Sequence, residues 1–182
     1  MAIHFESKDL YMKNLTMDDF AGFFELQSDP DVMKYTGKSL LKQSETECLQ
    51  YFQKIIEHQN GSEVYYRFWG VFEKISNDFI GTGSIANRNG KQEMGYTLHK
   101  KYWGKGYGTQ LAKAILQYGF EILELKKIVA EVDCQNIASV KILDRTMNRK
   151  IGTFWNQTEQ TYDYHYTLKN PNHANILQRC LK

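Results

Sequence analysis

The sequence predicts a single α+β domain, in which a mixed, largely antiparallel sheet is flanked by helices. Two stretches in the first third of the chain and two in its second half carry apolar residues at three- and four-residue spacing, which indicates amphipathic helices. Between them, residues 65–99 alternate with the two-residue period of strands, and the turns between these strands are short. A length of 182 residues fits one domain with a core of its own.

The first third of the chain is expected to form one short strand and two helices. Residues 10–15 alternate apolar and polar side chains, and Thr16 is suited to cap a helix whose apolar residues lie at 20–26. Ser44, followed three residues later by Glu47, is a capping-box pattern that opens a second helix. The core side of this second helix comprises Cys48, Tyr51, Phe52, Ile55 and Ile56.

Three antiparallel strands are expected next, at 65–72, 79–86 and 92–99, with turns at 77–78 and 87–90. After a glycine-rich loop, the order is expected to be helix, strand, helix and a closing hairpin. The first of these helices is a crossover between two strands, which are therefore expected to lie parallel and to border a ligand crevice. The expected positions are a helix on Leu111, Ile115, Tyr118 and Ile122, a strand at 128–132, a helix at 136–147, and a hairpin of 153–155 and 162–168.

Composition and charge exclude several classes of protein. Lys and Arg number 23 against 21 Asp and Glu, and a net charge of +2 without a basic block predicts no nucleic-acid partner. No apolar run approaches the roughly 18 residues of a membrane helix, and charges interrupt residues 1–9. Cys48, Cys134 and Cys180 are far apart and form no Cys-x-x-Cys pair, so neither a disulfide framework nor a metal site is predicted. We therefore expect a cytoplasmic protein that needs no metal and binds no membrane.

The loop at 103–109 is the sharpest local feature of the chain. Its glycines let successive backbone N–H groups point into one concavity at the start of a helix, where the helix dipole adds partial positive charge. Such a cradle suits a phosphate or pyrophosphate, and Lys105 adds a mobile positive charge. A glycine turn selected only for its tight geometry explains the same residues as well. The glycine spacing fits neither the P-loop pattern nor the dinucleotide-binding pattern.

Residues 93–99 and 102–109 are Glu-Met-Gly-Tyr-Thr-Leu-His and Tyr-Trp-Gly-Lys-Gly-Tyr-Gly-Thr. These segments resemble the Gcn5-related N-acetyltransferases, the GNAT superfamily, and most of all their RimJ/RimL-like, ribosomal-protein-alanine branch. The acetyl-CoA signature of that family is Gln/Arg-x-x-Gly-x-Gly/Ala. Gly106 and Gly108 fit the signature, whereas Trp103 departs from its first position.

A second stretch, at 136–139, is similar to the Asn-x-x-Ser start of a helix in the same family. The resemblance covers roughly residues 8–168, so we expect one GNAT domain over 1–182, with its core at 8–168 and a C-terminal appendage at 169–182. The family usually ends that helix with Leu-Gly-Phe, whereas residues 146–148 are Thr-Met-Asn. The exit of the helix is therefore expected to differ, with the asparagine in a left-handed conformation.

The resemblance implies an acyltransferase that moves an acetyl group from acetyl-CoA to a primary amine by direct attack in a ternary complex. The acceptor is expected to be a protein N-terminal amine or a small amine, and the protein a monomer or a homodimer. The pantetheine arm would lie beside 96–99, where this strand splays from its parallel neighbour, and a backbone N–H near Leu98 would polarise the thioester carbonyl. A non-catalytic acyl-CoA-binding or sensing domain and a nucleotide-binding module are the alternatives. The cofactor site implied is Leu98, Trp103, Lys105, Gly106, Tyr107, Gly108, Thr109 and Asn136.

Glu93 and Ser139 are the candidate catalytic residues. An α-amine has a pKa near 8, so a weak base acting through water suffices to deprotonate it, and Glu93 lies on the strand that leads to the loop. Many relatives in this family have a tyrosine one helical turn beyond the serine, but that position is Leu143 here. Ser139 is therefore the candidate donor to the leaving thiolate, with solvent or Tyr35 as alternatives. An ion-paired strand carboxylate and an ordinary first-turn serine explain Glu93 and Ser139 as well.

Overall fold

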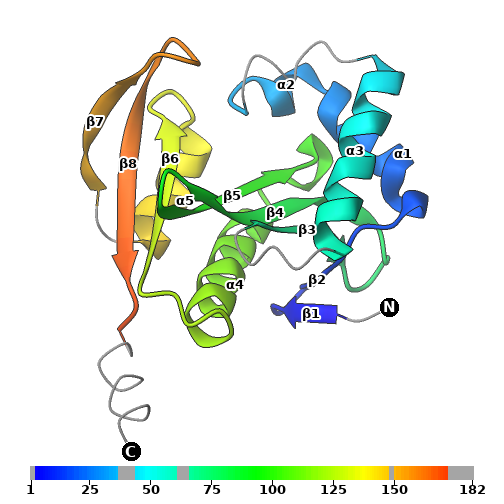
Figure 1. Cartoon of the computed structure of the whole chain (residues 1–182), viewed down its shortest axis with the longest axis horizontal. Coiled ribbons are helices and arrows are strands. Elements are labelled where there is room, and N and C mark those ends of the chain that lie inside the picture. Colours follow the sequence, from blue (N-terminus) through cyan, green and yellow to red (C-terminus); the bar gives the residue numbers. More distant parts are fainter. Residues whose placement is uncertain (1–2, 37–43, 61–65, 148–149, 172–182) are drawn as a thin grey trace, which may run out of the picture.

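The structure is a computed structural model, and it describes residues 3–36, 44–60, 66–147 and 150–171. These residues form one mixed sheet of eight strands in the order β1-β2-β3-β4-β5-β6-β8-β7, with helices packed against it (Figure 1). The strands are β1 (Ile3–Glu6), β2 (Leu10–Lys13), β3 (Tyr66–Glu73), β4 (Phe79–Arg88), β5 (Lys91–Leu98), β6 (Lys127–Asp133), β7 (Lys150–Asn156) and β8 (Thr161–Lys169). The helices are α1 (Phe20–Ser28), α2 (Pro30–Met33), α3 (Glu45–Asn60), α4 (Tyr107–Glu121) and α5 (Ile137–Thr146), with 3-10 turns η1 (Met17–Asp19) and η2 (Lys100–Tyr102).

The predicted fold class is confirmed, because the sheet is antiparallel except at the β5–β6 pair and each predicted strand and helix has a counterpart. Two short elements, β1 and α2, were not predicted. Thr16 is an N-cap, as predicted, with Asp18 and Asp19 in the first turn, but this turn is the 3-10 turn η1, which runs directly into α1. Asp19 Oδ2 accepts a hydrogen bond from the Thr16 N–H at 2.8 Å, which favours the tighter turn ahead of the helix.

The β5 and β6 strands are parallel neighbours that share a single register pair, Glu93 with Val129. Each of them is paired along its whole length on its other side, β5 with β4 and β6 with β8. The sheet therefore consists of two well-paired halves that touch at one point and part beyond it, and Figure 1 shows β6, β8 and β7 standing apart from the remaining strands. The predicted parallel, splayed pair is confirmed.

Neighbouring residues of β3 point to opposite faces of the sheet, as strand geometry requires. Trp69 and Val71 pack in the main core with α4 and α5, whereas Phe68 packs with α1 and α3 on the other face. The α4 helix contacts both halves of the sheet, because a Cβ at Gly119 would lie 2.6 Å from Ile128 of β6 and 3.0 Å from Ile85 of β4. Its main buried residues are Leu111, Ala112, Ile115, Leu116 and Phe120.

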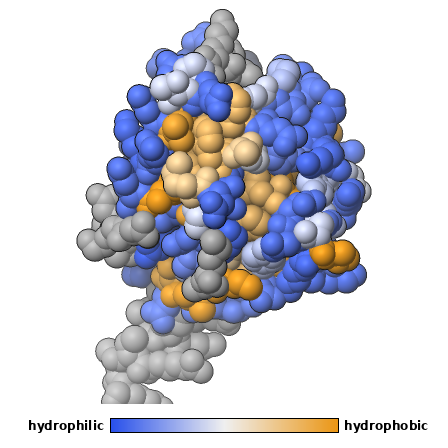
Figure 2. Space-filling model, turned by 90° about the vertical axis from the view of Figure 1, so that its right-hand side faces the viewer, coloured by the Kyte–Doolittle hydropathy of each residue, from blue (hydrophilic) through white to orange (hydrophobic). Residues whose placement is uncertain are grey.

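The side of the molecule that carries α1 and α3 is shown in Figure 2. Apolar residues gather at the centre of this face, and hydrophilic residues surround them. Phe20 and Phe24 of α1 are only partly buried and stack on each other at 6.0 Å between ring centroids. Among the described helices, none is both long and apolar enough to cross a membrane.

Replacing Ile115 with alanine should lower the free energy of unfolding by about 2–5 kcal/mol, because the side chain is 0% exposed and its loss leaves a cavity between α4 and β4. Ile122, just after the same helix, is 64% exposed and provides the control: Ile122→Ala should change stability by less than about 0.5 kcal/mol. Urea unfolding of both variants measures the difference. Equal losses of unfolding free energy in the two variants would contradict the conclusion that the buried side of α4 stabilises the sheet.

Candidate active site

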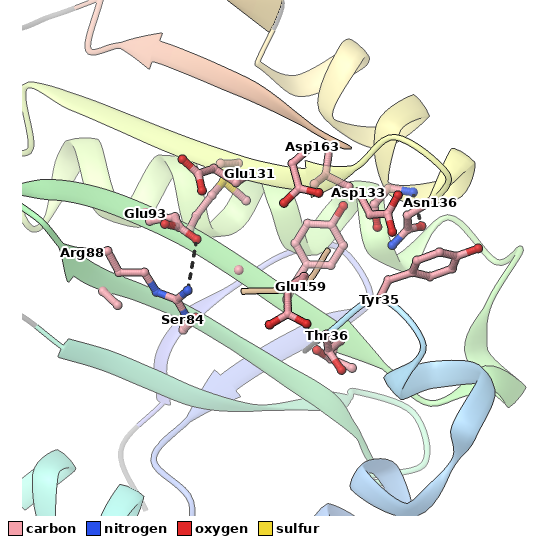
Figure 3. A pocket seen from close by; sticks show the side chains of 18 of the residues that line it. Tyr35, Thr36, Ser84, Arg88, Glu93, Glu131, Asp133, Asn136, Glu159 and Asp163 are labelled. Carbon is pink, nitrogen blue, oxygen red and sulfur yellow. Dashed lines mark hydrogen bonds and ion pairs between the residues drawn. The ribbon is translucent and has the colours of Figure 1, made fainter. Parts of the chain in front are cut away.

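A pocket of about 600 Å³ opens where β5 and β6 part. Its walls come from strands β3, β4, β5, β6 and β8, from the start of α5, and from the segment that follows α2. Figure 3 shows polar side chains of these elements around the opening. The labelled groups include Tyr35, Arg88, Glu93, Glu131, Asp133 and Asp163.

Acidic side chains outnumber basic ones in the wall of this pocket. The acidic residues are Glu93, Glu131, Asp133, Glu159 and Asp163, and the basic residues are Lys34, Arg88 and Lys91. Part of this charge is used internally, since the His165 ring lies 3.0 Å from Glu131 and the Asn156 amide donates to Asp163 at 2.7 Å. Nowhere in the described ranges are three or more His, Cys, Asp or Glu side chains arranged to hold a metal ion. The remaining negative charge favours a cationic ligand over an anionic one.

Glu93 lies on β5 at the point where the strands begin to part, and its side chain is 18% exposed in the pocket wall. Arg88 Nη1 is 3.7 Å from Glu93 Oε1, a loose ion pair that Figure 3 marks with a dashed line. Burial raises the pKa of Glu93 above its ordinary value, against the opposing effect of Arg88, and Glu131 adds to the increase. A carboxylate with a raised pKa that faces a pocket is a better proton acceptor than a solvated one. The position of Glu93 therefore fits both interpretations, a general base and a carboxylate in an ion pair.

Asn136 and Ser139 lie at the start of α5, and both line the pocket. Asn136 Oδ1 accepts a hydrogen bond from the Ser139 N–H at 3.2 Å, which confirms the predicted N-cap of this helix. Leu143, one turn further along, is also in the pocket wall and is buried. The cap fixes the Ser139 backbone at the mouth of the gap between β5 and β6.

The predicted anion cradle stands at the other end of β5. Gly104 and Gly106 have φ angles of 76° and 81°, in the left-handed region that glycine adopts without strain. Gly106 is the N-cap of α4, so the first backbone N–H groups of the helix, from Tyr107 to Thr109, have no partner within the helix. Gly108 has a different reason to be glycine, because a Cβ there would lie 2.7 Å from Ile142 of α5.

The side chains of this loop fix its position against the sheet. The Trp103 indole N–H donates to the Leu98 carbonyl at 2.8 Å, at the very end of β5. The Tyr107 hydroxyl donates to Glu73, and this bond raises the pKa of Tyr107 to about 12. Lys105 is exposed, with its ammonium 4.9 Å from the centre of the Tyr102 ring. The Tyr107 side chain is therefore engaged away from the cradle, which leaves its backbone as the group available to an anion.

One edge of β5 faces the gap to β6. The His99 N–H donates to the carbonyl of Ile80 in β4 at 2.9 Å. Because backbone groups alternate along an antiparallel strand, those of Thr97 and Gly95 also point toward β4, and those of Leu98 and Tyr96 point toward the gap. The Leu98 carbonyl already accepts from Trp103, so an extended ligand can pair with the Leu98 N–H and the backbone groups of Tyr96 as an additional strand.

The structure brings only some of the predicted site residues together. Glu93, Ser139 and Asn136 share the pocket, whereas the predicted cofactor residues Leu98 and 103–109 lie outside its wall. Glu93 and Leu98 are five residues apart on one extended strand, which corresponds to about 16 Å. A base at Glu93 can therefore serve a reaction centre near Leu98 only through intervening water.

Tyr96 is a pocket residue that the sequence analysis missed as a site residue. Its side chain packs against the core beside α5, and its hydroxyl oxygen is buried with no hydrogen-bond partner among the described residues. Burial raises the pKa of Tyr96 to about 12, and the nearby Ser139 hydroxyl offsets part of that increase. The alternation of side chains along β5 predicts that Tyr96 and Glu93 point to opposite faces of the sheet. The sequence does not say which of the two faces borders the pocket.

The splayed parallel strands, the glycine cradle at a helix start and the pocket between them define a class of acyl-transfer domain. The model of the acetyltransferase (GNAT) domain matches residues 9–146, well over half of the chain. The chain therefore belongs to the GNAT acetyltransferase family.

Curated relatives and solved structures agree with this assignment. The chain is 27% identical over 146 residues to an uncharacterized N-acetyltransferase, p20, of Bacillus licheniformis, which covers 79% of this chain and 80% of the relative. A spermidine N-acetyltransferase from Vibrio cholerae, solved with CoA and spermine, superimposes with a TM-score of 0.75 at 20% identity, over 92% of this chain and 99% of that one. RimL, a ribosomal L7/L12 alpha-N-protein acetyltransferase solved with coenzyme A, superimposes with a TM-score of 0.76 at 17% identity, over 92% and 98%. One of these structures is a spermidine acetyltransferase and the other a protein acetyltransferase. They therefore do not establish the RimJ/RimL-like branch for this chain.

Replacing Gly106 with valine should cost about 1–3 kcal/mol of stability, because a branched residue is strained at a φ of 81° although a Cβ would meet nothing there. Gly106→Asn is the matched control and should lose clearly less, since asparagine tolerates the left-handed region. Chemical unfolding of the two variants gives the comparison. Identical stabilities would show that the loop does not need its left-handed residue.

Proposed function

We propose that this protein transfers an acetyl group from acetyl-CoA to a primary amine by direct attack in a ternary complex. One observation carries the proposal: β5 leads from the open N–H groups at the start of α4 to an acidic pocket, with a free backbone edge between the two. An extended molecule with a pyrophosphate at one end and a thioester at the other fits this order of N–H groups, strand edge and pocket. Membership of the GNAT family supports the same donor.

The residues present fit acetyl-CoA without a metal. The backbone N–H groups of Gly106, Tyr107, Gly108 and Thr109 would bind the pyrophosphate, with Lys105 as a mobile counter-charge. The backbone groups of Tyr96 would pair with the pantetheine arm, and the Leu98 N–H is suited to polarise the thioester carbonyl. Trp103 would act indirectly, by satisfying the Leu98 carbonyl and fixing the loop against β5.

The pocket would receive the amine on the side of Glu93. At pH 7 about a tenth of an α-amine with a pKa near 8 is neutral, whereas an alkyl amine such as that of a polyamine, with a pKa near 10.4, is almost fully protonated and depends more on a base. Glu93, whose pKa is raised by burial, would accept the amine proton through water as the C–N bond forms. Asn136 would hold the start of α5 in place beside the thioester, with Ser139 in its first turn.

The charge of the pocket and the activities of similar proteins favour particular classes of acceptor amine. Five acidic residues against three basic ones favour a cationic amine. A polyamine is the first candidate, because a spermine/spermidine N(1)-acetyltransferase of Bacillus subtilis is among the relatives, at 22% identity over 135 residues. A protein N-terminal amine, as the RimJ/RimL-like resemblance suggests, is the second.

Calorimetric binding of acetyl-CoA, followed by free-thiol release with a panel of amines, tests the proposal. We expect acetyl-CoA to bind, and thiol release to exceed the rate without amine for spermidine or for a peptide with an N-terminal alanine. Binding without release for every amine would indicate the sensing domain instead. Binding of NAD or ATP in place of acetyl-CoA would indicate a nucleotide-binding module.

Glu93→Gln should lower turnover at neutral pH about a hundred-fold and leave the Kd for acetyl-CoA nearly unchanged. The wild-type rate should fall as the pH drops through the pKa of Glu93, because the protonated carboxyl is no longer a base, whereas the variant should lack this step. Part of its rate should return at high pH, where the amine is already neutral. A pH–rate profile of both proteins measures this, and matching profiles would leave Glu93 only its ion pair with Arg88.

A further inference from the structure

The Tyr96 hydroxyl is a buried polar group that the proposed mechanism leaves unused. Three described side chains carry a buried polar atom without a hydrogen-bond partner: Gln59, Tyr96 and Thr167. Of these, only Tyr96 lies in the wall of the pocket. Burying a hydrogen-bond donor without a partner lowers stability, and a hydroxyl in this state at a pocket is available to a ligand.

The strand directs this hydroxyl toward the start of α5, beside the gap between β5 and β6. Tyr96 stands opposite Gly83 of β4 on the α4 side of the sheet, where a Cβ at Gly83 would meet Ile115 at 3.0 Å. Its phenol reaches the first turn of α5, where a loose hydrogen-bonding approach of the Ser139 hydroxyl lowers the pKa of Tyr96 but is too poor in geometry to satisfy the buried oxygen. The backbone of Tyr96 borders the same gap between β5 and β6.

Acetyl transfer needs a donor at the sulfur atom. As the amine nitrogen bonds to the thioester carbon, the C–S bond breaks and its electron pair remains on sulfur. A donor that is aimed at this developing charge in a dry site accelerates the step, because it interacts more strongly with the thiolate than with the thioester. A phenol is a far stronger acid than the hydroxyl of Ser139 and thus the better donor, and the side chain of Leu143 cannot donate at all.

We propose that Tyr96 is a catalytic residue whose Oη–H donates a hydrogen bond to the sulfur of the leaving thiolate. This inference rests on the proposed acetyl transfer. Because burial keeps the pKa of Tyr96 at about 12, the phenol is protonated at neutral pH and remains so beside a thiolate, whose thiol has a pKa near 8.5. Tyr96 therefore stabilises the thiolate without transferring its proton, and the thiolate takes a proton from water after release. The amine proton leaves separately, through Glu93.

Tyr96→Phe is the direct test, measured as the single-turnover rate of acetyl transfer with saturating acetyl-CoA and amine. We expect the rate to fall about ten- to a hundred-fold, with the Kd for acetyl-CoA within about three-fold of wild type. The Tm should stay the same or rise, because the variant removes an unpartnered buried hydroxyl. Tyr118→Phe is the matched control: Tyr118 packs between Phe5 and Trp69, outside the pocket wall, and its rate should match wild type.

A second measurement needs no turnover. At pH 9, where much of the free thiol is ionised, wild type should bind CoA several-fold more tightly than desulfo-CoA, which lacks the sulfur. Tyr96→Phe should remove most of that preference, and Tyr118→Phe should keep it. Equal affinities of wild type for the two ligands, or an unchanged preference in Tyr96→Phe, would overturn the inference.

The results separate this inference from the proposed function. If wild type releases thiol with an amine and Tyr96→Phe does so at the same rate, Tyr96 is not a donor although acetyl transfer stands. If Tyr35→Phe alone slows the reaction, the donor is Tyr35 and the inference is again wrong. If wild type binds acetyl-CoA but transfers nothing to any amine, the proposed function itself fails.

Discussion

The rest of the structure depends on the way in which β5 and β6 meet. They share the single register pair of Glu93 and Val129, while β4 and β8 pair with them fully on their outer sides. The two halves of the sheet therefore separate beyond this pair. The absence of further β5–β6 pairs leaves a backbone edge of β5 and a pocket between the halves. Such a gap would be unstable alone, because unpaired backbone groups are costly when buried. The apolar side of α4, which packs beneath both halves, offsets that cost.

The two ends of β5 border different parts of the candidate site. The far end of β5 is tied to the glycine loop by the Trp103 indole, and its near end carries Glu93 in an acidic pocket. The N-cap at Asn136 brings the start of α5 to the middle of the gap. A donor molecule bound along β5 would thus meet backbone groups first, then Tyr96 and Ser139, and last the amine. Solved structures at 17–20% identity share this fold.

Elements with a strong period or a capping residue could be predicted from the sequence, and the finer geometry could not. The α4 stripe and the Asn136 cap are local signals, so both predictions are confirmed. The four residues of β1 are too few to show a period, and their strand exists because β2 pairs with them. Tyr96 was missed because the face of a strand is set by its neighbours. Gly108 was assigned to the cofactor cradle alone, whereas its space is also filled by Ile142, from a helix far along the chain. The predicted left-handed residue after α5 lies outside the described residues, as does most of the expected C-terminal appendage.

Amide hydrogen exchange along β5, followed by NMR with and without acetyl-CoA, tests the central claim most directly. The account predicts that acetyl-CoA slows exchange at Tyr96 and Leu98, whose N–H groups face the gap, and at the first residues of α4. The amides of Gly95 and Thr97 point toward β4 and serve as internal controls, so their exchange should change little. Saturating acetyl-CoA that protects α4 but leaves Tyr96 and Leu98 unchanged would contradict the assignment of the gap between β5 and β6 as the acyl-CoA site.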